Sequence, residues 1–177
     1  IIIDTDPGQD DALAMMTAFG AKKDLNVLGV TCVAGNVPLD LTSVNALKIC
    51  ELSGFFSVPV FRGSPGPLKR KLITAEHVHG KTGLDGTDLS VKKKELEPTD
   101  AVDFIIECTQ KYRDEKITIC ALGPLTNVAK VLKKDSVLTE SIEEIVLMGG
   151  GFFEGGNITP AAEFNIYVDP EAAKIVL

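Results

Sequence analysis

The chain has 177 residues, of which 45% are hydrophobic and 24% are charged, so it is long enough to bury a substantial core as one globular domain. Its formal net charge of -7 argues against a nucleic acid or an anionic membrane as a partner, because phosphate groups are bound by concentrated basic surface. No apolar run reaches the roughly 18 residues that a membrane-spanning helix needs.

Strand and helix patterns alternate along the chain. The segment "IIID" at residues 1–4 predicts a short buried strand, and helix-forming residues follow from 10 to 23, with Gly20 as a stop signal. The later patterns predict, in order, a strand at 25–33, a helix at 39–54, a strand at 58–61, a helix at 99–113, a strand at 116–122, a helix at 123–134 and a strand at 143–150. Apolar strands that are each followed by a helix indicate a parallel sheet covered on both faces. We therefore predict an α/β fold with an open, mainly parallel sheet flanked by helices and a Rossmann-like core.

Two further segments complete the predicted organisation. Residues 62–98 are rich in Gly, Pro, Lys and Asp, and such a long irregular connection in a compact domain is usually functional or mobile. The final segment "DPEAAKIVL" predicts a helix with Asp169 as its cap and Pro170 at its first position. Because the chain begins inside a strand and stops while still apolar, we expect residues 1–177 to be a single α/β domain that lacks the C-terminal part of the full domain.

Neither the lysine runs nor the cysteines indicate a special site. The basic runs at 69–71 and 92–94 are short, and we interpret them as solvated faces of loops or helices. The four cysteines are widely spaced and form no C-x-x-C pair, which favours reduced core cysteines in a cytoplasmic protein: Cys32, Cys50, Cys108 and Cys120.

The chemically distinctive stretch is "DTDPGQDD", which places four carboxylates directly after the first strand: Asp4, Asp6, Asp10 and Asp11. The carboxyl ends of parallel strands meet at one edge of a sheet, where ligands collect. That edge also receives polar groups that follow later strands, among them Asn36 and the segment "ALGPLTN". Four carboxylates this close repel one another unless positive charge compensates them, so a bound cation is indicated.

The donor types favour Ca²⁺ or Mg²⁺, because carboxylate, amide and carbonyl oxygens are hard ligands, whereas Zn²⁺ prefers Cys and clustered His. The stretch is not an EF-hand loop, since it lacks the D-x-D-x-D-G spacing. An alternative interpretation treats Asp10 and Asp11 as helix N-terminal residues and Asp4 as a turn residue. That interpretation accounts for two of the four carboxylates.

Five segments, in this order along the chain, resemble the nucleoside hydrolases, the inosine-uridine preferring ribohydrolases and their relatives. They are "DTDPGQDDALAM", "VAGN", "ALGPLTN", "IVLMGGG" and "GNITPAAEFNIYVDPEAA". The resemblance implies an open α/β fold, a tightly held Ca²⁺ and hydrolysis of the N-glycosidic bond of ribonucleosides to ribose and free base. It also implies a small-molecule ribonucleoside as the partner and a homo-oligomer, either a dimer or a tetramer.

Carried onto this sequence, the resemblance implies that Asp6 and Asp11 bind Ca²⁺ together with the main-chain carbonyl of Leu122. Asp6 would also be the general base for the attacking water, with Asn36 beside the water and the ion. Asp4 would lie behind the residues that bind the ion, without binding it directly.

The same resemblance implies a ribose-binding set, in which Asp10 and Asn165 hold the 2'- and 3'-hydroxyls, Asn157 and Glu163 hold the 5'-hydroxyl, and Met148 packs under the sugar. His77 and His79 fall in the long irregular segment, where related proteins place a flap over the base, and His79 is the stronger candidate for a contact to the base. The chain has no Trp and two Tyr, which favours the mixed or pyrimidine-preferring branches.

A further Asp ligand and a His at the leaving base come from a later segment in the family, so we expect residues 1–177 alone to show little or no hydrolase activity. Two other functions stay open at this point. A haloacid dehalogenase-type phosphohydrolase would also begin with a D-x-D pair, here Asp4 and Asp6, but Pro7 and Gly8 follow where that family has other residues. A non-catalytic module that binds nucleosides or Ca²⁺ is the second alternative.

Overall fold

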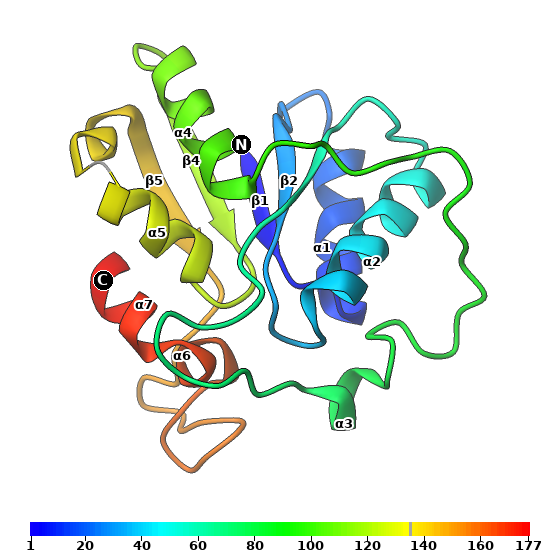
Figure 1. The fold of residues 1–177 in the computed structure, drawn as a ribbon, viewed down its shortest axis with the longest axis vertical. Helices are drawn as coiled ribbons and strands as arrows, with labels where there is room; N and C mark the ends of the chain where they lie inside the picture. Colours follow the sequence, from blue (N-terminus) through cyan, green and yellow to red (C-terminus); the bar gives the residue numbers. More distant parts are fainter. Residues whose placement is uncertain (135) are drawn as a thin grey trace.

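The computed structural model describes residues 1–134 and 136–177 (Figure 1). Its elements alternate along the chain as β1 Ile2–Thr5, α1 Gln9–Gly20, β2 Gly29–Cys32, α2 Leu39–Leu52, β3 Val60–Arg62, α3 Glu76–His79, α4 Ala101–Lys111, β4 Ile117–Ala121, α5 Thr126–Lys134, the 3-10 helix η1 Ser136–Ser141, β5 Ile142–Leu147, α6 Phe164–Val168 and α7 Pro170–Val176. Within the described residues, no helix is long and apolar enough to cross a membrane.

The five strands form one parallel sheet in the order β3-β2-β1-β4-β5, which confirms the predicted α/β fold. The first strand lies in the middle, and the chain adds β2 and β3 on one side before it returns to add β4 and β5 on the other. This return is the topological switch point of a doubly wound sheet, and the loops that leave β1 and β4 lie beside each other there.

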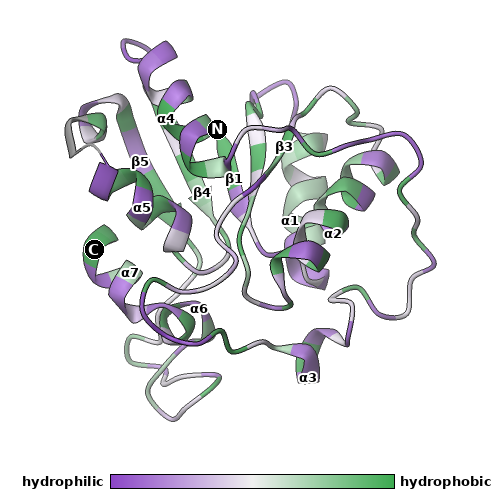
Figure 2. Cartoon of the chain, viewed as in Figure 1, coloured by the Kyte–Doolittle hydropathy of each residue, from purple (hydrophilic) through white to green (hydrophobic). Residues whose placement is uncertain are grey.

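Two hydrophobic cores cover the two faces of the sheet (Figure 1). Helices α1 and α2 pack on one face, and α4, α5 and α7 pack on the other. The neighbouring residues Ile2 and Ile3 of β1 belong to opposite cores, because successive side chains of a strand point to opposite faces. Figure 2 shows the same division, with hydrophobic strands in the centre and helices that turn their hydrophilic residues outward. The apolar runs of the sequence are therefore strands buried on both sides.

A buried polar network ties the centre of the sheet to α5. The Nδ2 of Asn127 donates to Asp4 Oδ1 at 2.8 Å and to the carbonyl of Cys32 at 3.0 Å, and its Oδ1 accepts from the N–H of Ser64 at 2.8 Å. Thr31 donates a further hydrogen bond to Asp4 Oδ1 at 2.6 Å. Asp4 is thus a buried strand residue, and its interpretation as a turn residue is wrong.

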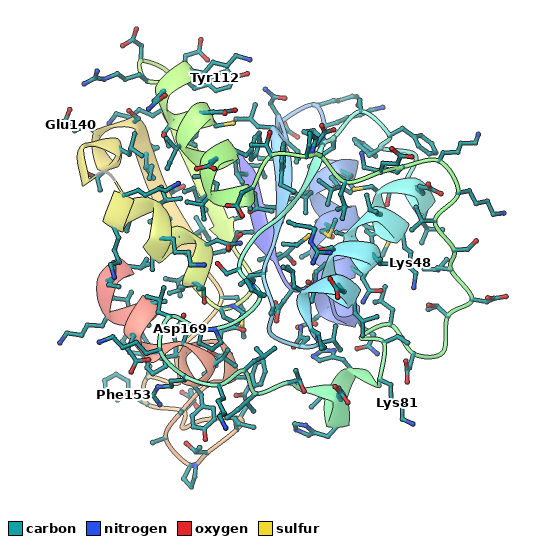
Figure 3. All side chains as sticks on the ribbon, viewed as in Figure 1. Lys48, Lys81, Tyr112, Glu140, Phe153 and Asp169 are labelled. Carbon is teal, nitrogen blue, oxygen red and sulfur yellow. The ribbon has the colours of Figure 1, made fainter. Side chains whose placement is uncertain are left out.

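A second buried carboxylate joins three segments at the C-terminal end. Asp169 caps α7, as predicted, by accepting from the N–H of Ala172, and it also accepts from Thr126 and from the N–H of Leu68 (Figure 3). These contacts hold the long connection after β3 against α5 and α7. The connection is largely irregular, as predicted, apart from the one-turn helix α3.

Several sequence-based predictions need correction. The predicted strand at 25–33 is limited to Gly29–Cys32, and the short helices α3, α6 and η1 were not predicted. Lys94 is not a solvated residue, because it is buried and its Nζ donates to the carbonyls of Phe56 and Val58. The four cysteines are free thiols, as predicted, and Cys120 alone among them is half-buried.

We expect Asn127→Ala to lower the free energy of unfolding by about 3 kcal/mol, because the substitution leaves the buried Asp4 carboxylate and two backbone groups without their amide partner. Urea titration of the purified variant checks this. Asn26→Ala, at an exposed position, is the matched control and is expected to change stability by less than about 0.5 kcal/mol. Equal losses in the two variants would contradict the structural role of Asn127.

Candidate active site

The acidic stretch forms a tight turn between β1 and α1. Pro7 and Gly8 end the strand, and Asp10 and Asp11 lie in the first turn of the helix, where the helix dipole favours negative charge. Asp11 Oδ2 accepts from the N–H of Gly8 at 3.1 Å, and its Oδ1 accepts from the hydroxyl of Thr5 at 2.6 Å. The alternative interpretation of Asp11 as a helix-terminal residue is therefore correct for its position, yet Asp11 also lines a pocket.

Asn36 joins Asp6 to Asp11. Its backbone N–H donates to Asp6 Oδ2 at 2.7 Å, while its Nδ2 donates to the carbonyl of Asp6 at 3.0 Å and to Asp11 Oδ2 at 3.2 Å. Two glycines make room for the Asp6 carboxylate, since a Cβ added at Gly35 or Gly123 would overlap its oxygens. These glycines come from the loops after β2 and β4, so three strand ends shape one carboxylate site.

Burial of this much negative charge changes its protonation. Burial raises the pKa of Asp6 well above its usual range, and the charge of the nearby Asp11 raises it further. Burial also raises the pKa of Asp11 to about 6, although hydrogen bonds from Thr5 and Gly8 act in the opposite direction. The site thus holds two carboxylates that need either protons or a cation.

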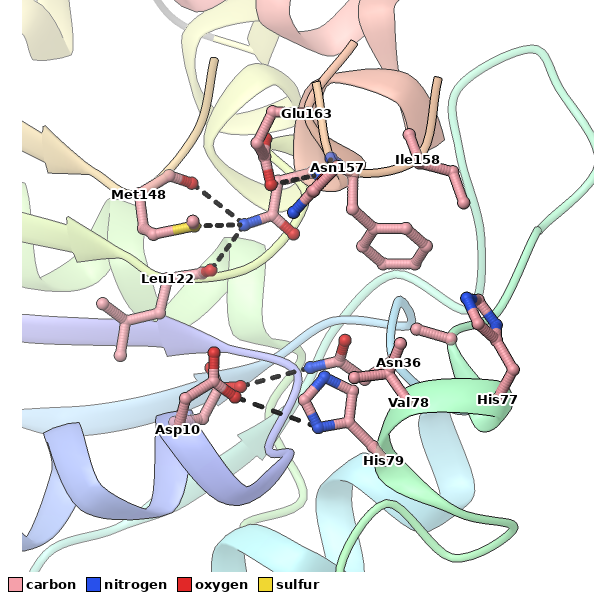
Figure 4. Close-up of a pocket in the computed structure, with 14 residues that line it drawn as sticks. Asp10, Asn36, His77, Val78, His79, Leu122, Met148, Asn157, Ile158 and Glu163 are labelled. Carbon is pink, nitrogen blue, oxygen red and sulfur yellow. Dashed lines mark hydrogen bonds and ion pairs between the residues drawn. The ribbon is translucent and has the colours of Figure 1, made fainter. Parts of the chain in front are cut away.

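A pocket of about 240 Å³ opens beside these carboxylates (Figure 4). Nine of the predicted site residues line it: Asp10, Asp11, Asn36, His79, Leu122, Met148, Asn157, Glu163 and Asn165. Asp6 is buried behind the lining and reaches the pocket through its contacts with Asn36. The structure therefore brings the predicted residues together from four strand ends, α3 and α6.

The wall opposite the acidic turn is built by α6 and the strand end before it. Asn165 donates from Nδ2 to the carbonyls of Leu122 at 2.7 Å and Met148 at 2.9 Å (Figure 4). Glu163 caps α6 by accepting from the N–H of Asn165 and Ile166, and it also accepts from the N–H of Gly150. These hydrogen bonds fix an amide and a carboxylate at the edge of the pocket.

The long irregular segment supplies the third wall through α3. The His79 side chain is 13% exposed and lies against the acidic turn, with its Nδ1 4.0 Å from Asp10 Oδ1. His77 lines the outer part of the pocket and is exposed. The two histidines therefore differ in environment, with His79 the less exposed of the two.

Several pocket residues were not predicted, namely Ala75, Val78, Ile158 and Phe164. Phe164 is the buried first residue of α6, and it gives the pocket an aromatic side chain that the absence of Trp did not lead us to expect. A helix of five residues is too short to leave a periodic signal, so nothing in the pattern pointed to it.

The donor set fits a hard divalent cation. The Asp6 and Asp11 carboxylates and the Leu122 carbonyl come from adjacent strand ends, and the glycine-lined space around Asp6 would be filled by any larger residue. Among the residues that the structure describes, no three His, Cys, Asp or Glu side chains form a metal-binding group by themselves. A cation at this place would take carbonyl and amide oxygens, which are ordinary Ca²⁺ ligands, in addition to the two carboxylates.

A family model described as inosine-uridine preferring nucleoside hydrolase matches residues 1–177. The chain belongs to this family. The pyrimidine-specific ribonucleoside hydrolase RihB of Escherichia coli is 46% identical over 176 residues, which cover 99% of this chain and 55% of RihB. The haloacid dehalogenase alternative is therefore not supported.

Solved structures of nucleoside hydrolases share the fold. A plant nucleoside hydrolase superimposes with a TM-score of 0.92 at 40% identity, over 99% of this chain and 55% of the plant protein. A purine-preferring ribonucleoside hydrolase from Gardnerella vaginalis gives a TM-score of 0.92 at 34% identity, over 98% of this chain and 56% of the Gardnerella protein. The chain thus spans about half the length of the nucleoside hydrolases that it matches.

The buried Asp4 makes stability depend on pH in a predictable direction. Burial raises its pKa from the ordinary 3.8 to about 6, so the folded protein binds more protons than the unfolded chain between these values. With a chelator present, stability should fall as the pH rises from 4 to 6, and the share of Asp4 is about 3 kcal/mol. Asp4→Asn keeps an acceptor for Thr31 and Asn127 and cannot titrate, so its profile should be shallower by that amount.

Urea unfolding of the wild type and Asp4→Asn across this pH range checks the prediction. Asp24→Asn, at an exposed position, is the matched control and should leave the profile unchanged. Parallel profiles for the wild type and Asp4→Asn would contradict it.

Proposed function

We propose that the protein containing this chain hydrolyses the N-glycosidic bond of ribonucleosides in the pocket between α1, α3 and α6. The observation that carries the proposal is the convergence of buried carboxylates on one side of the pocket with a fixed amide and carboxylate on the other. A ribose has hydroxyl groups on more than one edge, and such a two-sided polar pocket matches it. Family membership supports the same reaction class.

Ca²⁺ is the proposed cofactor, held by Asp6, Asp11 and the Leu122 carbonyl. When bound, it supplies positive charge that offsets the carboxylates and polarises a water and the sugar hydroxyls. The raised pKa values of Asp6 and Asp11 support this assignment, since both buried carboxylates are costly to ionise unless a cation lies beside them.

Asp6 is the proposed general base. Its carboxylate is buried and is held by the Asn36 N–H. With the positive charge of Ca²⁺ beside it, Asp6 would be ionised, and an ionised carboxylate can take a proton from the attacking water. Asn36 would orient that water, because the same residue contacts both Asp6 and Asp11.

The sugar would be gripped from both sides. Asp10 and Asn165 are proposed to bind the 2'- and 3'-hydroxyls, and Asn157 and Glu163 to bind the 5'-hydroxyl, with Met148 below the ring. Cleavage of a glycosidic bond builds positive charge on the ribose, which these carboxylates stabilise. Glu163 already accepts backbone hydrogen bonds on both oxygens, yet a carboxylate has about four acceptor sites, so it retains room for a hydroxyl.

The departing base would meet α3. His79 lines the pocket from that side and is proposed to contact the base, with Phe164 as an apolar neighbour across the pocket. Relatives include a pyrimidine-specific and a purine-preferring hydrolase, so both base classes belong in the first assay.

The decisive experiment follows base release from uridine and inosine by the protein at its natural length, with Ca²⁺ present. We expect turnover of at least one of them, and a loss on the order of 100-fold in kcat/KM for the matching 2'-deoxynucleoside, because buried groups that should bind the 2'-hydroxyl are left unpaired. Equal kcat/KM for the ribo and deoxy forms would refute the ribose assignment. No release of any base would favour the non-catalytic binding module.

Metal retention gives an independent prediction. Asp11→Asn should abolish retention of Ca²⁺ after dialysis, because one of the two buried carboxylate ligands is lost. Elemental analysis of the purified variant measures this, and Asp24→Asn at an exposed position is the matched control. A full equivalent of Ca²⁺ in Asp11→Asn would show that Asp11 is not a ligand.

A further inference from the structure

Gln9, the first residue of α1, contacts His79 at two points. Its Oε1 lies 2.5 Å from His79 Nδ1, and its Nε2 donates to the backbone carbonyl of His79 at 3.3 Å. The two residues are 70 positions apart in the chain. One side-chain amide therefore contacts both the ring and the backbone of the same histidine.

The backbone contact fixes which way the Gln9 amide points. A carbonyl oxygen can only accept a hydrogen bond, so the amide group that faces it must be the NH₂ group. The amide oxygen then faces His79 Nδ1, which must carry the proton of that short contact. A flipped amide would set two acceptor oxygens against each other and lose the bond to the His79 carbonyl.

The charge of Asp10 also favours a proton on His79 Nδ1. Asp10 Oδ1 lies 4.0 Å from His79 Nδ1, beyond hydrogen-bond distance, so its negative charge favours a proton there while Gln9 supplies the hydrogen bond. In Figure 4 the other ring nitrogen of His79 points away from Asp10 and into the pocket. The neutral imidazole therefore keeps its hydrogen at the protein side and its lone pair at the pocket side.

The position of α3 against the acidic turn is also constrained. Asn45, buried in α2, donates from Nδ2 to the carbonyl of Pro7 at 3.1 Å and to the carbonyl of Thr82 at 2.7 Å. This bridge ties the acidic turn to the loop that follows His79. Gly8 leaves space for the ring, because a Cβ there would lie 2.5 Å from His79 Nδ1. The contact with Gln9 is thus part of a fixed arrangement.

We propose that Gln9 is a positioning residue that holds His79 as its Nδ1–H tautomer, so that the neutral ring presents a hydrogen-bond acceptor, Nε2, to the ligand in the pocket. The ligand chemistry that fits this acceptor is an N–H or O–H edge, such as the ring N–H of uracil or hypoxanthine. His79 becomes a donor to the ligand only after Nε2 has taken up a proton. The link to nucleobases rests on the proposed function, whereas the tautomer does not.

Nitrogen NMR of the histidine-labelled protein at alkaline pH, where imidazole side chains are neutral, tests the tautomer directly. Couplings between the ring nitrogens and the carbon-bound ring hydrogens distinguish the two tautomers, and His77→Gln and His79→Gln variants assign the signals. We expect Nδ1–H for His79, whereas the exposed His77 should show the Nε2–H form that free imidazole side chains favour in water.

Two matched variants at the exposed Gln9 separate positioning from general packing. Gln9→Leu keeps the bulk and removes both polar groups, so His79 should shift to Nε2–H. Gln9→Glu loses the bond to the His79 carbonyl but keeps an acceptor oxygen for Nδ1, so it should retain Nδ1–H. An Nε2–H signal for His79 in the wild type, or an Nδ1–H signal in Gln9→Leu, would overturn the proposal.

Activity provides the second readout. Gln9→Leu should lower kcat/KM for uridine or inosine by about 10- to 100-fold, the loss seen when partners that orient metal-binding histidines are removed. Gln9→Glu should stay within about threefold of the wild type. Unchanged kcat/KM in Gln9→Leu would overturn the positioning role. A wild type that lacks all hydrolase activity but shows Nδ1–H would refute the proposed function and support the tautomer assignment.

Discussion

The repulsion among carboxylates at the end of β1 is the constraint around which the site is arranged. Asp6 and Asp11 are both buried and close enough to raise the pKa of Asp6, and such a pair is stable only with compensating groups. Each compensating group has its own structural requirement. Asn36 has to follow β2 and Thr5 has to end β1, since both donate to these carboxylates, and Gly123, which leaves room for Asp6, has to follow β4.

The sheet order satisfies all three requirements at once. With β1 in the middle, the loops after β2 and β4 flank the acidic turn, so polar groups from both halves of the chain lie next to it. The two hydrophobic cores on opposite faces then hold the strand ends in register. A fold with β1 at the edge would leave one side of the carboxylates open to solvent.

The strands and long helices could be predicted because their apolar periodicity is strong, and the gathering of the motif residues at one sheet edge could be predicted because parallel strands end there. The boundaries of β2 could not, since an apolar run continues before the strand begins pairing at Gly29. The contact of Gln9 with His79 crosses 70 positions and depends on an irregular segment, so no local pattern reports it. Lys94 was misjudged for the same reason, because the carbonyls that bind its ammonium group belong to a distant loop.

The central place of β1 also has a consequence for synthesis and folding. Strand β1 is synthesised before its partner β4, which begins at Ile117, and the lining of the pocket within the described residues extends to Asn165. These contacts have high sequence separation, and such long-range parallel pairing is slow to form. Until it forms, the carboxylates of the acidic turn stay hydrated and the apolar residues of β1 remain unpaired with β4. The acidic turn is therefore made well before the groups that complete its site, so the site is assembled late in folding.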